Sequence, residues 1–205
     1  MLHILQSPPP SASDTALRAM FAARKSVFVD LLKWDVPVLD GRYEVDQFDD
    51  LNATYVILAD CDGAHLGSAR LLPTMRPHIL DSLYPDLCED KPPRAPDIFE
   101  ITRFCLDRRL RAAERRDVRD TLVTALVEHA LSHKIAAYSA IAEMSWFQQI
   151  LAFGWRCRPL GLPQRLGAAT LAALRIDITR DTPALLAAAG IVPKSILHAA
   201  RPIAA

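Results

Sequence analysis

The sequence has little glycine and no long apolar run. Only 7 of its 205 residues are glycine, and no apolar stretch approaches the ~20 residues that a membrane-spanning helix requires. The first residues also lack the charged region and apolar core of a signal peptide. These absences disfavour a membrane protein and predict a cytoplasmic one.

Net charge and closely spaced cysteines are absent as well. Lys and Arg together number 24, as do Asp and Glu, which disfavours nucleic acid or a membrane surface as the main partner. The four cysteines are widely separated without a C-x-x-C pair, so we interpret them as reduced structural thiols. We therefore expect no metal ion and no permanently bound cofactor. Nothing in the sequence indicates the oligomeric state.

The composition, 51% hydrophobic and 23% charged, predicts one compact domain over residues 1–205, with loose termini at 1–12 and 191–205. Strand and helix patterns alternate without a strict βαβ rhythm, which favours an α/β sandwich around a mixed sheet. Expected strands lie at 2–5, 54–59, 66–72, 98–106, 135–142, 155–160 and 171–178. Expected helices lie at 13–31, 75–83, 117–131, 144–153 and 183–189.

An acidic, aromatic segment at residues 33–49 has almost no apolar period. Trp34 offers an electron-rich face to a cation. Carboxylates that can accept from an ammonium group or attract a sulfonium are Asp35, Asp40, Glu44, Asp46 and Asp49. Composition alone also fits a solvated acidic loop with one aromatic anchor.

The helix before this segment favours a binding site. Arg24 falls on its apolar stripe, where a guanidinium needs a carboxylate or an anion because it cannot lose its proton. Phe28 lies one turn later on the same face. We therefore expect one pocket formed by Arg24, Phe28, Trp34, Asp46 and Asp49.

Two expected strands contain charges. Arg70 lies within one, and Glu100 and Arg103 lie within another. Residues three apart face opposite sides of a regular strand, whereas a β-bulge between Glu100 and Arg103 would turn both toward one site and free backbone N–H groups. An internal ion pair that ties two layers together is an equally good reading of Glu100 and of Arg103 singly. For Arg70 the alternative is an exposed sheet face, which the buried character of the flanking segments disfavours.

A basic run precedes the helix that we expect Asp117 to cap. It comprises Arg108, Arg109, Arg111, Arg115, Arg116 and Arg119. A solvated helix face explains such a run about as well as a docking surface for an acidic partner.

These motifs together are similar to those of the acyl-homoserine-lactone synthases, the autoinducer synthases of bacterial quorum sensing. The resemblance runs from residue 17 to residue 178. It rests on Arg24 with Phe28, Trp34-Asp35, Glu44-Val45-Asp46-Gln47-Phe48-Asp49, Arg70-Leu71-Leu72-Pro73-Thr74 and Glu100-Ile101-Thr102-Arg103-Phe104.

The resemblance implies a fold similar to the N-acetyltransferases and a reaction of S-adenosylmethionine, a substrate here, with an acyl thioester on acyl carrier protein or coenzyme A. The amine forms an amide, and the carboxylate then displaces the sulfonium, which closes the lactone and releases 5′-methylthioadenosine. The sulfonium suits Trp34 and Phe28, the ammonium suits Asp46 or Asp49, and the carboxylate suits Arg24 or Arg103.

The resemblance also implies roles for further residues. Glu100 would be the general base, with Asp46 as the alternative, and Arg70 and Arg103 would complete the catalytic set. The acyl chain and thioester would contact Thr102, Phe104, Ala142, Met144 and Trp146. Acyl carrier protein would dock on Arg115 and Arg116.

Two departures from the family pattern bear on the acyl donor. The acetyltransferase pyrophosphate loop has its nearest counterpart at residues 108–113, but Arg111 replaces a glycine, which favours a carrier-protein donor. Residues 159–163 and 143–146 nevertheless look like a branch with acyl-coenzyme A users. Ala142 and Glu143 stand where members that make 3-oxoacyl products tend to have threonine.

Two alternative functions remain at this stage. One is an N-acetyltransferase that uses acetyl-coenzyme A and another amine, which the missing loop glycine disfavours. The other is a silent sensor of S-adenosylmethionine, which the complete charged set disfavours.

Overall fold

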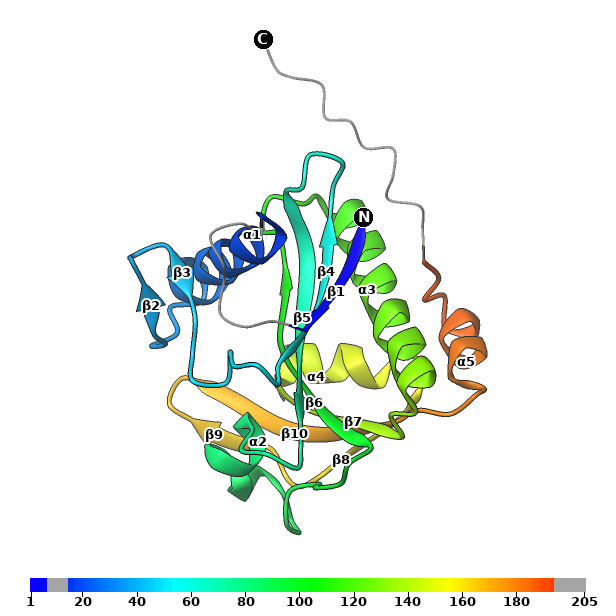
Figure 1. Ribbon diagram of the computed structural model, residues 1–205. Coiled ribbons are helices and arrows are strands. Elements are labelled where there is room, and N and C mark those ends of the chain that lie inside the picture. Colours follow the sequence, from blue (N-terminus) through cyan, green and yellow to red (C-terminus); the bar gives the residue numbers. More distant parts are fainter. Residues whose placement is uncertain (7–14, 194–205) are drawn as a thin grey trace.

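A computed structural model describes residues 1–6 and 15–193 of the chain. An eight-stranded sheet forms its centre, with the strand order β1-β4-β5-β6-β7-β10-β8 and β9 paired to β10 (Figure 1). Its strands are β1 (Leu2–Gln6), β4 (Thr54–Ala59), β5 (His65–Pro73), β6 (Ile98–Leu106), β7 (Ala137–Glu143), β8 (Arg156–Pro159), β9 (Gln164–Leu166) and β10 (Ala169–Asp177). A separate hairpin comprises β2 (Val38–Leu39) and β3 (Tyr43–Glu44).

Helices cover both faces of the sheet. They are α1 (Thr15–Arg24), the π-helix η1 (Lys25–Leu31), α2 (Ile79–Ser82), the 3₁₀ helix η2 (Pro85–Leu87), α3 (Ala112–His133), α4 (Met144–Leu151) and α5 (Thr182–Ala188). In Figure 1, α1 and α3 lie on opposite sides of β4 and β5.

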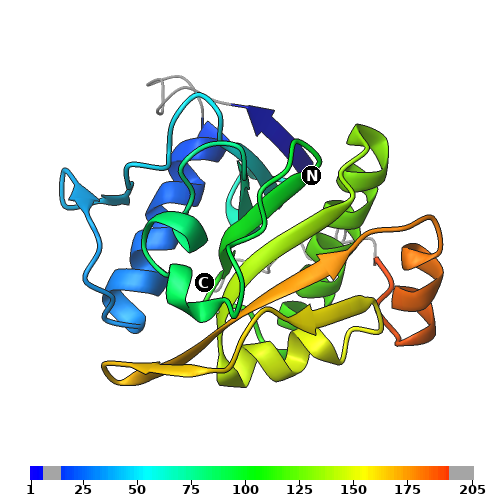
Figure 2. The ribbon, with the colours of Figure 1, turned by 90° about the horizontal axis from the view of Figure 1, so that it is seen from below.

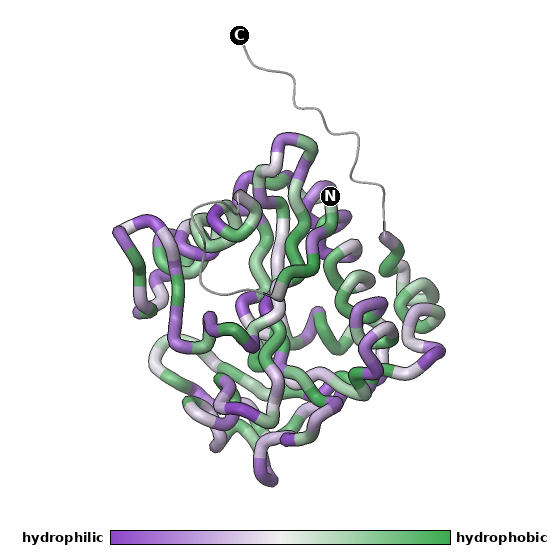
Figure 3. Tube along the Cα trace, viewed as in Figure 1, coloured by the Kyte–Doolittle hydropathy of each residue, from purple (hydrophilic) through white to green (hydrophobic). Residues whose placement is uncertain are grey.

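Each face of the sheet has its own apolar core. On one side, α1 buries Leu17, Met20 and Phe21 against Tyr55 and Ile57 of β4. The other core is larger and includes Val56, Leu71, Leu122, Leu126 and Leu174. Alternate residues of β4 thus face different helices, as the period of two in a strand requires. Figure 3 shows the hydrophobic strands at the centre and the hydrophilic segment around β2 and β3 at the periphery. The predicted three-layer α/β sandwich is confirmed.

The pairing of β6 with β7 is parallel, whereas all the other strand pairs described are antiparallel. It runs only from Ile98↔Ala137 to Ile101↔Ala140, although β6 continues to Leu106 and β7 to Glu143. The two strands therefore separate beyond this point, whereas β10 (orange) runs alongside β7 (yellow-green) in the sheet (Figure 2). Both cavities described below adjoin this separation.

Several expected boundaries need correction. The long helix α3 begins at Ala112, after the N-cap residue Arg111, so Asp117 lies inside the helix and does not cap it. The Glu114 side chain instead accepts from the Arg111 backbone N–H at 2.9 Å. The helix expected over residues 75–83 is a single turn, Ile79–Ser82, because two prolines flank this segment. The expected cap near Ser13 or Asp14 lies outside the described residues.

The edge strand predicted at residues 2–5 is present as β1, so this part of the expected loose N-terminus pairs with β4. The hairpin β2–β3 and the short strand β9 were not predicted. Among the helices that the structure describes, none combines the length and hydrophobicity needed to cross a membrane.

Candidate active site

Arg24 ends α1 and lies completely buried, with three carboxylate contacts. Its Nε donates to Glu44 at 2.5 Å. Its two terminal nitrogens donate to Asp49 at 2.8 and 2.9 Å, which is the bidentate geometry that a planar guanidinium favours. The chain then continues as the π-helix η1, a form that is rare and often found at functional sites.

These contacts belong to a closed ring of three arginines and three carboxylates. Arg70 binds Asp49 at 2.7 Å and Asp46 at 2.6 Å. Arg103 binds Asp46 at 2.7 Å and Glu44 at 3.0 Å. Each arginine therefore touches two carboxylates and each carboxylate touches two arginines. With Arg24 included, the formal charges of the ring cancel.

Mutual attraction outweighs desolvation in this ring. Burial alone would lower the pKa of Arg24, but Asp49 and Glu44 raise it above its usual value. Burial would raise the pKa of Asp49, yet Arg24 and Arg70 hold it well below its usual range. Tyr55 also donates its hydroxyl to Asp49 at 2.9 Å. Arg24, Arg70 and Asp49 are therefore charged at neutral pH, as buried ions with complete partners can be.

The hairpin β2–β3 brings Glu44 to the ring. Asp40 and Gly41, in its three-residue turn, have φ angles of 52° and 63°, values that asparagine, aspartate and glycine tolerate best. An Asp-Gly pair between apolar residues is a hairpin signal, and it could have revealed this element from the sequence. Sequence reasoning named Glu44 as an acceptor but did not assign it to the site.

A β-bulge formed by Arg103 and Phe104 positions Arg103, slightly further along the strand than the bulge between Glu100 and Arg103 that the sequence suggested. Ser68 pairs with Cys105 and Arg70 pairs with Thr102, so β6 has one more residue than β5 in between. Arg103 has a φ of 51°, which is uncommon for a residue with a side chain and typical of strain at functional sites. The bulge turns Arg103 toward the same cavity as Glu100.

Glu100 is completely buried, on the strand between the two cores. Its carboxylate accepts from the backbone N–H groups of Ile79 at 2.8 Å and Leu80 at 3.0 Å, at the start of α2. Burial raises the pKa of Glu100 to about 8, although these two hydrogen bonds oppose the shift. A carboxyl with a pKa near neutrality can exchange a proton with a substrate.

Two cavities share a wall at this position. The larger has a volume of about 530 Å³ and is lined by polar and aromatic groups, including Asp46, Glu100, Arg103 and Tyr84. The smaller, about 360 Å³, extends between β6, β7, α3 and α4 and is mainly apolar. The residues that line both are Trp34, Ile101, Thr102, Arg103, Ile141 and Glu143. Two different ligands can therefore approach one another across Thr102 and Arg103.

Aromatic side chains form one end of this wall. Phe28 and Trp34 stack with ring centroids 4.7 Å apart and an interplanar angle of 15°. The Arg103 guanidinium carbon lies 5.7 Å from the Phe28 ring centroid and 5.8 Å from that of Trp34. Arg103 thus provides a cation for these rings. Trp34 remains 45% exposed and leaves area for a ligand.

The structure brings most of the expected residues to the cavities. Thr102 accepts from the Arg70 Nε at 2.9 Å and lines both cavities. Residues expected to contact the acyl group that line the smaller cavity are Thr102, Phe104, Ala142 and Trp146. Its apolar end is also lined by Ile150, Phe153 and Trp155, which sequence reasoning missed because their helix and strand patterns equally describe ordinary core residues.

Five expected residues lie outside both cavity linings. Arg24, Asp49 and Arg70 have fully buried side chains and do not line either cavity. Met144 packs against the large core, outside both linings. Arg115 lies on the rim of the smaller cavity, whereas Arg116 is exposed on α3 outside it.

Comparison with known proteins matches this geometry to one family. The family model for autoinducer synthases matches residues 11–185. The acyl-homoserine-lactone synthase of Ralstonia nicotianae is 33% identical over 198 residues, which cover 92% of this chain and 95% of the relative. A structure of BjaI, a CoA-dependent acyl-homoserine lactone synthase with SAM and isopentyl-CoA, is 30% identical with a TM-score of 0.84, covering 96% of this chain and 92% of BjaI.

A more distant likeness concerns the fold alone. A putative N-acetyltransferase from Lactobacillus plantarum is 18% identical with a TM-score of 0.56, covering 87% of this chain and 98% of that protein. The predicted similarity to the N-acetyltransferase fold is confirmed. With the family model matched over most of its length and a full-length relative above 30% identity, the chain belongs to the autoinducer synthases, the acyl-homoserine-lactone synthase family.

Proposed function

We propose that this protein acylates the amine of S-adenosylmethionine with an acyl thioester and closes the product to an acyl-homoserine lactone. The observation that carries the proposal is the pair of cavities that meet at Thr102 and Arg103 beside Glu100: four carboxyl groups line the larger one, whereas aliphatic and aromatic side chains close the far end of the smaller one. S-adenosylmethionine fits the larger cavity with its carboxyl groups, and the acyl chain fits the apolar end of the smaller one. The related BjaI, whose structures contain SAM, isopentyl-CoA or MTA, supports the assignment.

Glu100 serves as the general base in this proposal. The amine nitrogen attacks the thioester carbonyl carbon, the thiolate leaves, and the nitrogen loses a proton to Glu100, through a water molecule. A carboxylate oxygen of the methionine part then attacks its γ-carbon and displaces the sulfonium as 5′-methylthioadenosine. Asp46 is the less suitable base, because both of its oxygens already accept from Arg70 and Arg103.

Arg103 binds the substrate carboxylate, because it lines the cavity whereas Arg24 does not. Its guanidinium also lies against Trp34, so the carboxylate is held near the aromatic wall. Arg24, Asp49 and Arg70 act behind the wall and fix Asp46 and Arg103 through the ion-pair ring. Their role is to position the binding groups.

Acyl carrier protein is the proposed acyl donor. Arg115 lies on the rim of the apolar cavity and Arg116 lies one residue further along α3, where they can attract an acidic carrier and its phosphopantetheine phosphate. Arg111 caps α3 where the acetyltransferase loop needs a glycine. Coenzyme A is the second candidate, because the similar BjaI structure contains isopentyl-CoA.

The function is tested by incubating the purified protein with S-adenosylmethionine and acyl thioesters of several lengths, then analysing the mixture by mass spectrometry. We expect equal amounts of an N-acyl-homoserine lactone and 5′-methylthioadenosine. Parallel reactions with acyl carrier protein and coenzyme A thioesters identify the donor. Acylation of other amines without lactone would instead indicate an N-acetyltransferase, and binding without product would indicate a sensor.

A further inference from the structure

The larger cavity has more carboxyl groups in its lining than cations, and the proposed substrate has a net positive charge. S-adenosylmethionine carries a sulfonium, an ammonium and one carboxylate at neutral pH, so its net charge is positive. The cavity lining contains four carboxyl groups, on Asp35, Asp46, Glu100 and Glu143, and the cation Arg103. Which of these carboxyl groups is free to meet a cation decides how the substrate is recognised.

The ring leaves no charge over for the substrate. Asp46 accepts from the Arg70 Nη1 at 2.6 Å and Nη2 at 3.0 Å, and from the Arg103 Nη2 at 2.7 Å. The Phe48 backbone N–H donates to the same carboxylate at 2.9 Å. Since the three arginines already neutralise the three carboxylates of the ring, Asp46 adds little attraction for a further cation.

In the free protein, Glu100 cannot supply the negative charge that would attract the cationic substrate. Its oxygens accept from Ile79 and Leu80, and burial raises its pKa to about 8, so it is mostly uncharged at pH 7. Asp35 and Glu143 are therefore the two remaining carboxylates of the lining.

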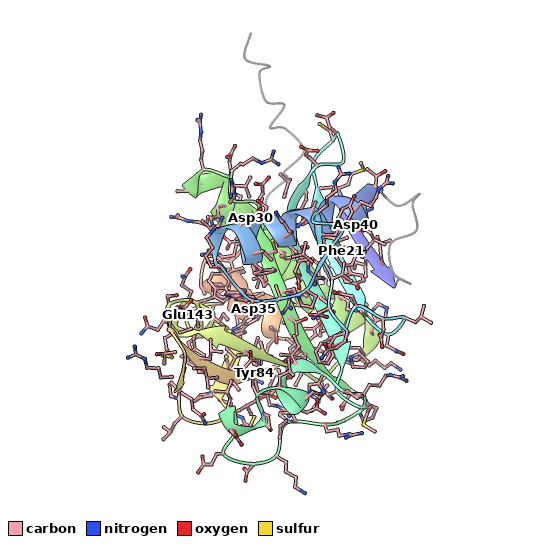
Figure 4. All side chains as sticks on the ribbon, turned by 90° about the vertical axis from the view of Figure 1, so that its left-hand side faces the viewer. Phe21, Asp30, Asp35, Asp40, Tyr84 and Glu143 are labelled. Atoms are coloured by element: carbon pink, nitrogen blue, oxygen red, sulfur yellow. The ribbon has the colours of Figure 1, made fainter. Side chains whose placement is uncertain are left out.

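These two carboxylates are exposed, and neither has a hydrogen-bond or ion-pair partner within the part of the chain that the structure describes. Asp35 comes from the segment after η1, next to Trp34. Glu143 ends β7 opposite Leu171 of β10, and it lines the same cavity as Asp35. Figure 4 shows both on the same side of the molecule, with Tyr84 below them. Glu143 also lines the acyl cavity, so it stands where the two substrates meet.

We propose that Glu143 and Asp35 together recognise the positive charge of S-adenosylmethionine, with Glu143 on the wall shared with the acyl cavity. This inference rests on the proposed function, and it assigns the selection of the cationic substrate to residues outside the ion-pair ring. The neutral product 5′-methylthioadenosine lacks the sulfonium and the ammonium. The two carboxylates therefore favour the substrate over the product and assist product release.

The test compares charged and uncharged ligands by calorimetric titration of the full chain. Glu143→Gln and Asp35→Asn should each weaken S-adenosylmethionine binding by about three- to tenfold, the effect of removing one partly solvated charge. Binding of 5′-methylthioadenosine should change less than twofold. S-adenosylhomocysteine, a thioether with the same amino-acid part, should lose less affinity than S-adenosylmethionine. Added salt should weaken S-adenosylmethionine binding by the wild-type protein more than binding by the variant that combines both substitutions.

Asp40→Asn is the matched control, because Asp40 is an exposed carboxylate in the β2–β3 turn outside both cavities. It should leave all three affinities unchanged. Equal losses for S-adenosylmethionine and 5′-methylthioadenosine would show that the two residues only shape the cavity, and an unchanged S-adenosylmethionine affinity would also overturn the proposal. Failure of the wild-type protein to make a lactone, with charge-dependent binding intact, would overturn the proposed function alone.

Discussion

At the scale of single residues, Glu100 combines properties that oppose one another. Burial raises its pKa to about 8, whereas a general base must be ionised before it can accept a proton. A cation bound in the same cavity stabilises the ionised carboxylate and lowers its pKa. The cationic substrate would therefore convert Glu100 into the base that its own acylation needs.

The protonation state of Glu100 can be measured directly. In protein labelled with ¹³C at the glutamate carboxyls, one signal should titrate near pH 8 in the free protein and disappear in Glu100→Gln. Adding S-adenosylmethionine should move this titration to lower pH, because the sulfonium disfavours the proton. A Glu100 signal with an ordinary carboxyl titration would contradict the burial argument.

Glu100→Gln should also separate binding from catalysis. The amide keeps the size of the side chain and one acceptor, so S-adenosylmethionine should still bind, whereas turnover should fall by roughly 10²- to 10⁴-fold. Steady-state rates and calorimetry on the same preparation provide the two values. A variant with the wild-type rate would exclude Glu100 as the base.

At the scale of elements, the ion-pair ring ties α1, β3, β5 and β6 to the segment between β3 and β4. Asp49→Asn removes a charge from its buried centre and should lower the free energy of unfolding by roughly 3–5 kcal/mol. Because Arg24 and Arg70 hold the pKa of Asp49 low in the folded state, this stabilisation is present above about pH 4 and disappears as the pH falls.

Urea unfolding at pH 7 and at low pH measures this effect. Asp50→Asn is the matched control, since Asp50 is exposed and lies next in the sequence, and it should change the stability little. An Asp49 variant as stable as this control would show that the ring contributes no net stability.

Some of these elements could be predicted from the sequence, whereas the contacts of the loop between β3 and β4 could not. The strands at residues 54–59 and 98–106 were predictable from their buried apolar runs, and the charges within the second run suggested a bulge, which the structure places at Arg103 and Phe104. The carboxylate partner of Arg24 could not be predicted, because Asp46 and Asp49 lie close together in the sequence and either could reach Arg24. Their different burial arises from the loop conformation, which depends on contacts between distant elements.

At the scale of the whole molecule, the acyl donor must reach a cavity whose rim carries Arg115. Reversing the charges of Arg115 and Arg116 should raise the Michaelis constant for an acidic acyl carrier protein and flatten its dependence on salt. We propose that S-adenosylmethionine binds in the other cavity, so its affinity should remain. Steady-state kinetics between 0.05 and about 1 M salt test this, because the screening length contracts from ~10 Å at 0.1 M to ~3 Å at 1 M. An unchanged carrier-protein constant, or faster turnover with acyl-coenzyme A, would favour the coenzyme A donor.

The residues of the ion-pair ring are synthesised earlier than many of the residues that line the acyl cavity. All six ring residues lie between Arg24 and Arg103, whereas the acyl cavity needs β7, α4 and the end of β10 as well. The parallel partner of β6 arrives only after the α3 crossover of residues 112–133 has been synthesised. During translation, we expect the ion-pair ring to close on the first half of the chain. The acyl cavity then forms against a wall that is already in place.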